Sequence, residues 1–150
     1  MKVWVNFFPY VGTPEHLVRN IPLALDASGG INVPPFTQAT VHGTLVNQSA
    51  KTMHLTSLGG HMHKRGVRFS IWTSGGEKLL DDYDWAHPAV AKFDPPLDLA
   101  PGDHVDFECL HDNGVTRPIR RDYAGNPMTI VFGTSAEDEM CIITGQYYDD

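Results

Sequence analysis

The sequence predicts an all-β protein, an antiparallel β-sandwich that forms a single domain over residues 1–150. Glycine occurs 14 times and proline 11 times, and both residues punctuate the whole chain. Between them lie short runs rich in Val, Ile, Thr, Phe and Trp, which are the residues that favour strands. Because few stretches have the apolar spacing of a long helix, we expect a sandwich of short strands.

The expected elements follow from alternating apolar and polar residues that end at turn residues. Val3 to Tyr10 is the first expected strand. A short helical turn is expected at Thr13 to Leu17, because Thr13 can cap it and Pro14 suits the first helical position. The glycines of Ser74–Glu77 predict a hairpin turn. The other expected strands are residues 37–45, 51–58, 67–73, 78–85, 103–110, 129–132 and 141–148, and prolines bracket a short run at 97–99.

Composition limits the possible functions. A chain of 150 residues with 41% hydrophobic and 19% charged residues is typical of one globular domain with its own core. The net charge of -7 argues against a nucleic-acid partner, which would need a basic surface. No apolar stretch is long enough to cross a membrane.

Two histidines stand two residues apart in His61-Met62-His63, directly before an apolar run at 67–72. Side chains alternate along a strand, so the two imidazoles are expected on one side and Met62 on the other. Such a pair is half of a metal site or two ordinary surface histidines, and the pattern alone leaves both open.

A second group of possible ligands lies near the end of the chain, in the run Glu137 to Cys141. We expect its acidic residues to form a solvated turn. Met140 is either a core residue or a soft thioether ligand, which with two imidazoles would favour Cu(I). Cys109 and Cys141 form no Cys-x-x-Cys pair, so one disulfide or two unrelated buried thiols remain open.

These blocks together resemble a known family. The tail from Phe132 to Tyr148 contains Gly-Thr-Ser, Asp-Glu-Met-Cys and a closing Tyr-Tyr pair, and Phe107 to Asn113 is a cysteine-bearing strand followed by a turn. With His61-Met62-His63 they resemble the C-terminal domain of the copper type II, ascorbate-dependent monooxygenases. This is the family of peptidylglycine alpha-hydroxylating monooxygenase and dopamine beta-monooxygenase. The resemblance covers about residues 50–150.

The resemblance implies a jelly-roll sandwich that binds one copper ion through His61, His63 and Met140. It implies a disulfide between Cys109 and Cys141. Apart from the resemblance, His111 follows Cys109 closely and is interpreted as a structural residue, with an approach to the copper as the alternative. The implied activity uses O2 or peroxide, with ascorbate or another reductant, to hydroxylate a C–H bond of an unknown small-molecule or peptide-like substrate. A second copper domain or another electron donor is the implied partner.

The implied disulfide predicts an extracytoplasmic protein, secreted or periplasmic, because disulfides persist in oxidising compartments. The chain opens on residues that read as a strand, so we expect its signal segment to be absent from this sequence.

The sequence also departs from the family. Gly59 stands where the peptide-hydroxylating members have a carboxylate-binding arginine, and Ile142 replaces a polar residue, so a peptidylglycine substrate is not expected. The chain is too short to include the family's three-histidine copper domain. Lys64 and Arg65 are interpreted as a surface pair, with an anion-binding rim as the alternative.

Two other functions use the same sequence features. The first is a non-catalytic copper-binding or copper-carrying domain with the same ligands. The second is a structural β-sandwich module of a larger secreted protein, in which the metal site is incidental.

Overall fold

The computed structural model describes residues 9, 11–22, 24–25 and 30–150. This part of the chain contains strands and no helix, and so no helix that could span a membrane. The strands are β1 (Arg19–Asn20), β2 (Ala24–Leu25), β3 (Asn32–Val33), β4 (Thr37–Val46), β5 (Met53–His61), β6 (Gly66–Thr73), β7 (Lys78–Asp82), β8 (Val90–Leu99), β9 (His104–Asn113), β10 (Ile130–Val131) and β11 (Ile142–Asp149).

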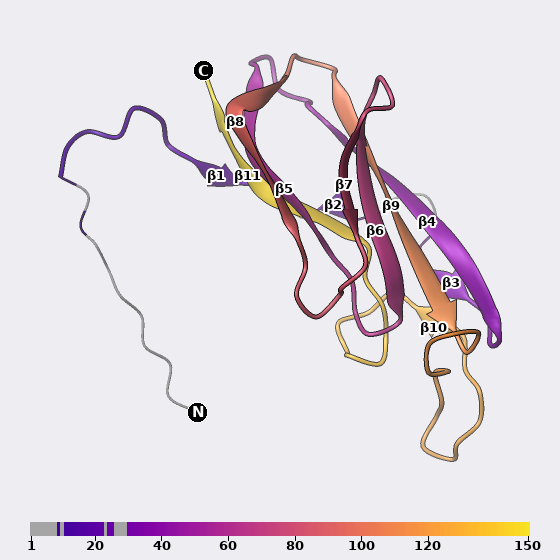
Figure 1. The fold of residues 1–150 in the computed structure, drawn as a ribbon. Coiled ribbons are helices and arrows are strands. Elements are labelled where there is room, and N and C mark those ends of the chain that lie inside the picture. The colour runs from indigo at the N-terminus through magenta and orange to yellow at the C-terminus, as the bar shows by residue number, and fades with distance from the viewer. Residues whose placement is uncertain (1–8, 10, 23, 26–29) are drawn as a thin grey trace.

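The strands form three antiparallel sheets. One larger sheet has the order β4-β9-β6-β7, and the other has the order β1-β11-β5-β8 with β2 also paired to β11. A small sheet pairs β10 with β3. Figure 1 shows the two larger sheets as two layers, with β5 and β11 in one and β6 and β9 in the other. The predicted all-β antiparallel sandwich is confirmed.

The core lies between these layers and follows from the alternation along each strand. In β9, Val105, Phe107 and Cys109 are buried, whereas the residues between them are partly exposed. The rings of Phe69 and Phe107 stack in the centre with centroids 5.8 Å apart. Burial of such large apolar side chains is the main favourable term in folding.

Gly60 has no side chain, and this allows the two layers to approach closely beside the histidine pair. Gly60 lies over the ring of Phe69, and a Cβ atom at position 60 would lie 2.2 Å from that ring. Only glycine therefore fits at this point of β5 without displacing Phe69. Because Gly60 directly precedes His61, this packing determines where β5 passes as it enters the site.

The N-terminal expectations have two outcomes. The strand expected at Val3 to Tyr10 lies outside the described residues apart from Pro9. The helical turn expected at Thr13 to Leu17 is wrong, because this segment has bends and no helix. Tertiary contacts outweigh the local capping signal here: His16 stacks on Tyr148 with ring centroids 4.0 Å apart, just before β1 pairs with β11.

Strand β8 is longer than the short run expected at residues 97–99, and it includes Pro95 and Pro96. Proline has no amide hydrogen to donate and is tolerated mainly on edge strands. β8 is such a strand, since β5 is its one partner among the described residues, and its register shifts between Leu55 and Ser57 of that partner.

Candidate metal centre

The two histidines lie at the point where β5 ends. His61 is the last residue of the strand, and a turn closed by the bond from the Gly66 amide to the His63 carbonyl (2.9 Å) leads into β6. Met62 is buried, whereas His61 is exposed and His63 half-buried. The two imidazole rings meet edge to face, with centroids 5.2 Å apart. The arrangement matches the alternation expected from the sequence.

The ring of His63 is held in one orientation and one tautomer. Its Nδ1 lies 2.9 Å from the backbone carbonyl oxygen of Asp138. A carbonyl oxygen can only accept, so Nδ1 carries the hydrogen and Nε2 keeps its lone pair free. A backbone carbonyl that binds one imidazole nitrogen is the usual outer partner of a metal-binding histidine.

The electrostatic surroundings favour the neutral form of His61. Although His61 is exposed overall, partial desolvation of its ring lowers its pKa, and the neighbouring His63 acts in the same direction. The carboxylate of Glu139 only partly opposes this. A neutral imidazole is the form that binds a metal ion.

Met140 reaches the same end of the sheet from the distant tail. Ile142 lies opposite His61 in the β5–β11 pair, and Met140 stands two residues before Ile142. The preceding residues Asp138 and Glu139 both bond to His63. The half-buried Met140 is therefore tethered on both sides of its position to the segment that carries the two histidines.

Glu139 contradicts the expectation that the acidic run is a solvated turn. This carboxylate is completely buried. One oxygen accepts from the amide of Arg65 at 2.6 Å and the other from the amide of His63 at 2.9 Å. The expectation fails because Glu139 satisfies the backbone of the histidine turn, a role that charge and local sequence do not reveal.

The expectation that Lys64 and Arg65 form a surface pair is wrong for Arg65. Its guanidinium is buried and donates to the Pro118 carbonyl (2.9 Å), to the Glu137 carbonyl (3.0 Å) and to the Glu137 carboxylate (3.0 Å). Lys64 pairs with the same carboxylate. Both cations thus bind the tail, so they do not form a free anion-binding rim. Asp138, the remaining acidic residue of the run, pairs with Arg120.

Cys109 and Cys141 form a disulfide, with an S–S distance of 2.02 Å. Cys109 belongs to β9 of one large sheet, and Cys141 directly precedes β11 of the other. The bond therefore joins the two layers beside Met140, and the pairing agrees with what the family resemblance implies.

His111 lies beside this disulfide. It is fully buried, and its Nδ1 is 3.5 Å from a carboxylate oxygen of Glu139. The ligand atoms of Cys109, His111 and Cys141 all lie within 4.8 Å of one another. The structure thus contains a buried Cys-His-Cys group that could hold a metal ion, although both sulfurs are engaged in the disulfide.

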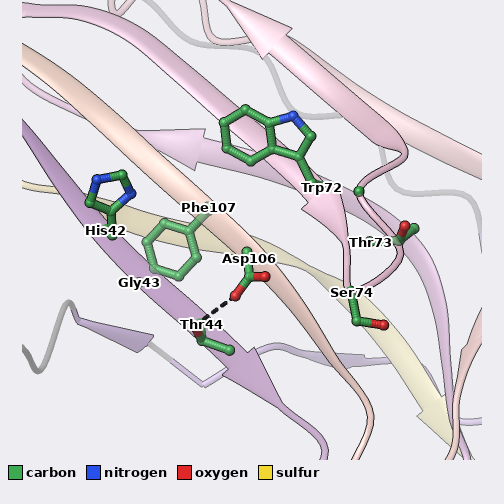
Figure 2. Close-up of a pocket in the computed structure, with 9 residues that line it drawn as sticks. His42, Gly43, Thr44, Trp72, Thr73, Ser74, Asp106 and Phe107 are labelled. Atoms are coloured by element: carbon green, nitrogen blue, oxygen red, sulfur yellow. Dashed lines mark hydrogen bonds between the residues drawn. The ribbon is translucent and has the colours of Figure 1, made fainter.

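A pocket on the four-stranded sheet is separate from these residues. Figure 2 shows it between β4, β6 and β9, with Trp72, His42 and Asp106 around it and a hydrogen bond of 2.8 Å from the Thr44 hydroxyl to Asp106. None of the expected copper ligands lines this pocket. It therefore adds nothing to the candidate metal centre.

No family model matches this sequence, and no curated protein matches it. The functional argument consequently depends on the geometry of the site and on the motifs themselves.

Proposed function

We propose that this chain is a mononuclear copper-binding domain of monooxygenase type, with His61, His63 and Met140 as ligands of one ion. The observation that carries the proposal is the bond from His63 Nδ1 to the Asp138 carbonyl, which leaves Nε2 as a free donor beside the His61 ring. The same tail segment then continues into Met140. Two imidazoles and a thioether form a donor set that suits Cu(I).

Bound copper would supply one-electron redox chemistry with O2 or peroxide and a reductant such as ascorbate, and would lead to hydroxylation of a substrate C–H bond. The residues of this chain supply orientation. The Asp138 carbonyl fixes the His63 tautomer, and the Glu139 carboxylate holds the turn that carries it. Cys141, bonded to Cys109, anchors the strand that follows Met140. His61 is exposed, so the site is open to a substrate.

A non-catalytic copper-binding or copper-carrying domain is the second candidate. The exposure of His61 favours it, because a carrier must offer its metal to a partner protein. Both candidates place the protein in a secreted or periplasmic setting, in keeping with its disulfide-bonded cysteines.

Copper titration tests the ligand assignment. We expect one Cu(I) per wild-type chain, and each of His61→Ala, His63→Ala and Met140→Ala should weaken Cu(I) binding by at least about 10- to 100-fold, the usual cost of disturbing a metal site. Met140→Ala should affect Cu(I) more than Cu(II), since a thioether prefers the softer ion. The control is His87→Ala, which removes an exposed histidine that pairs with Asp84. Unchanged Cu(I) binding in the ligand variants would exclude this site.

Turnover distinguishes the two candidates. A monooxygenase loaded with copper should consume oxygen or peroxide with ascorbate and yield a hydroxylated product from a panel of C–H substrates. A copper-loaded protein that consumes no reductant with any of them, but passes Cu(I) to a chelating acceptor, is a carrier.

A further inference from the structure

His111 is a buried imidazole with no hydrogen bond. Among the described residues, three buried side-chain nitrogens lack a hydrogen-bond partner, and two of them are the ring nitrogens of His111. Nδ1 lies 3.5 Å from the Glu139 carboxylate, but without the geometry of a hydrogen bond. A polar group left unsatisfied in the core is costly, so its presence calls for an explanation.

The side chain of His111 points to the disulfide. Cys109 stands two residues earlier on β9, so both side chains face the core, and Cys141 reaches them from the opposite sheet. The three potential donor atoms lie within 4.8 Å of one another, and all three residues are fully or almost fully buried. Two sulfurs and one imidazole nitrogen are the donors preferred by zinc and Cu(I).

We propose that Cys109, His111 and Cys141 form a second metal site that exists only when the disulfide is reduced, and that it takes a thiophilic closed-shell ion, zinc or Cu(I). A dithiol or phosphine reductant supplies two electrons, and with two protons the S–S bond becomes two thiols. On metal binding the two thiols release these protons to solvent, and the two sulfurs and one His111 nitrogen bind the ion. This proposal is independent of the copper assignment at His61, His63 and Met140.

The proposal requires the segment that ends at Cys141 to move when the ion binds. Cys141 ends the segment 132–141 that joins β10 to β11, and this segment has turns and bends but no regular strand. Cys109 and His111 lie within β9, which is paired on both sides by β4 and β6. Movement of the tail segment after reduction would therefore expose the site without separating the four-stranded sheet.

The test uses the full chain carrying His61→Ala and His63→Ala, so that the first candidate site cannot bind metal. Cobalt(II) serves as a spectroscopic substitute for zinc. After reduction with a phosphine under anaerobic conditions, we expect one Co(II) per chain and a thiolate-to-cobalt charge-transfer band, which zinc should displace. The same protein with its disulfide intact should give no such band.

Variants assign the ligands. Adding Cys109→Ser and Cys141→Ser should abolish the band, and adding His111→Ala should weaken Co(II) binding by more than about tenfold. The control is His104→Ala, which removes a partly exposed histidine of the same strand. With Cu(I) in place of Co(II), the reduced protein should remove the ion from a Cu(I) chelator, whereas the oxidised protein should not.

Four results would overturn the proposal. One is a reduced protein that remains folded, as judged by near-ultraviolet circular dichroism, but binds neither Co(II) nor Cu(I). Another is a band that appears only in unfolded protein or is unaffected by His111→Ala. If His111→Ala does not fold, X-ray absorption of the zinc-loaded reduced protein identifies the zinc ligands instead. Two sulfurs and an imidazole around the zinc would support the site, and a coordination shell without sulfur would contradict it.

Discussion

Glu139 shows how much of the site depends on single side chains that are not ligands. Its two oxygens accept the amides of His63 and Arg65, so one carboxylate orders the turn after β5. Carboxylates that accept backbone amides form stronger bonds than neutral acceptors do. The geometry of the histidine pair is therefore set by a residue from the far end of the chain.

Glu139→Gln should destabilise the protein by about 1–3 kcal/mol, because one acceptor oxygen is replaced by an amide that cannot accept. Denaturant unfolding measures the change. The matched control Glu77→Gln alters an exposed residue in the β6–β7 turn and should have almost no effect. Equal stabilities for the two variants would contradict the role assigned to Glu139.

His54 should make stability depend on pH. Hydrogen bonds to Asp150 and to Asp98 raise the pKa of His54. The folded state thus binds the proton more tightly than the unfolded state, so the stabilisation is fully present below the unfolded pKa of about 6.5 and is lost as pH rises through the folded pKa. His54→Gln should therefore reduce the free energy of unfolding more at about pH 5.5 than at about pH 9.

Titration of His54 by NMR provides the direct measurement. Asp98→Asn and Asp150→Asn should each bring its pKa down toward the ordinary value. A wild-type His54 pKa at or below that value would contradict the interpretation.

At the scale of elements, strands with regular alternation of apolar and polar residues were predictable from the sequence. Strands that form only through tertiary pairing were not. The expected strand at 37–45 is almost the whole of β4, and that at 67–73 matches β6, because both alternate or carry apolar residues up to clear turn residues. The edge strand β8 was predicted too short, because its two prolines are unfavourable in strands. The two-residue strands β1 and β2 exist only through their pairing with β11, which no local pattern reveals.

In the candidate site, too, the features set by local sequence were predictable and those set by distant contacts were not. The spacing of His61 and His63 predicted two neighbouring imidazoles, and their rings do lie together. Their exact geometry was not predictable, because β5 ends at His61 and Asp138 and Glu139 hold His63. The burial of Arg65 and Glu139 was not predictable, because charged residues are rarely buried unless paired, and their partners are distant in sequence. Arg65 bonds to Pro118, Glu137 and Glu139 at separations of 53, 72 and 74. A run of three acidic residues facing two cations was the available signal.

Gly60→Ala should disturb the strand that leads into the site. The added methyl group would lie 2.2 Å from the Phe69 ring, so either the ring or β5 must move, at a cost of about 1–3 kcal/mol. Gly75→Ala is the control, since its nearest neighbour would be 3.7 Å away. Denaturant unfolding should distinguish the two variants, and similar stabilities would show that β5 and Phe69 adapt without cost.

At the scale of the whole molecule, the disulfide joins the two large sheets covalently. Replacing both Cys109 and Cys141 by serine should lower the free energy of unfolding by about 2–4 kcal/mol, because the unfolded chain is no longer restricted. Thermal or denaturant unfolding gives the difference, and phosphine-reduced wild type without metal should show a similar loss. An unchanged stability would mean that packing alone holds the layers together.

The histidines and the tail that holds them are far apart in sequence: the bond between His63 and Glu139 spans 76 positions. During synthesis, His61 and His63 leave the ribosome long before the residues that orient them exist, and contacts of such separation form late in folding. A nascent chain therefore offers two imidazoles that are not yet oriented. Under the proposed copper assignment, selective copper loading would wait until β5 and β11 have paired, so we expect it after folding and not during translation.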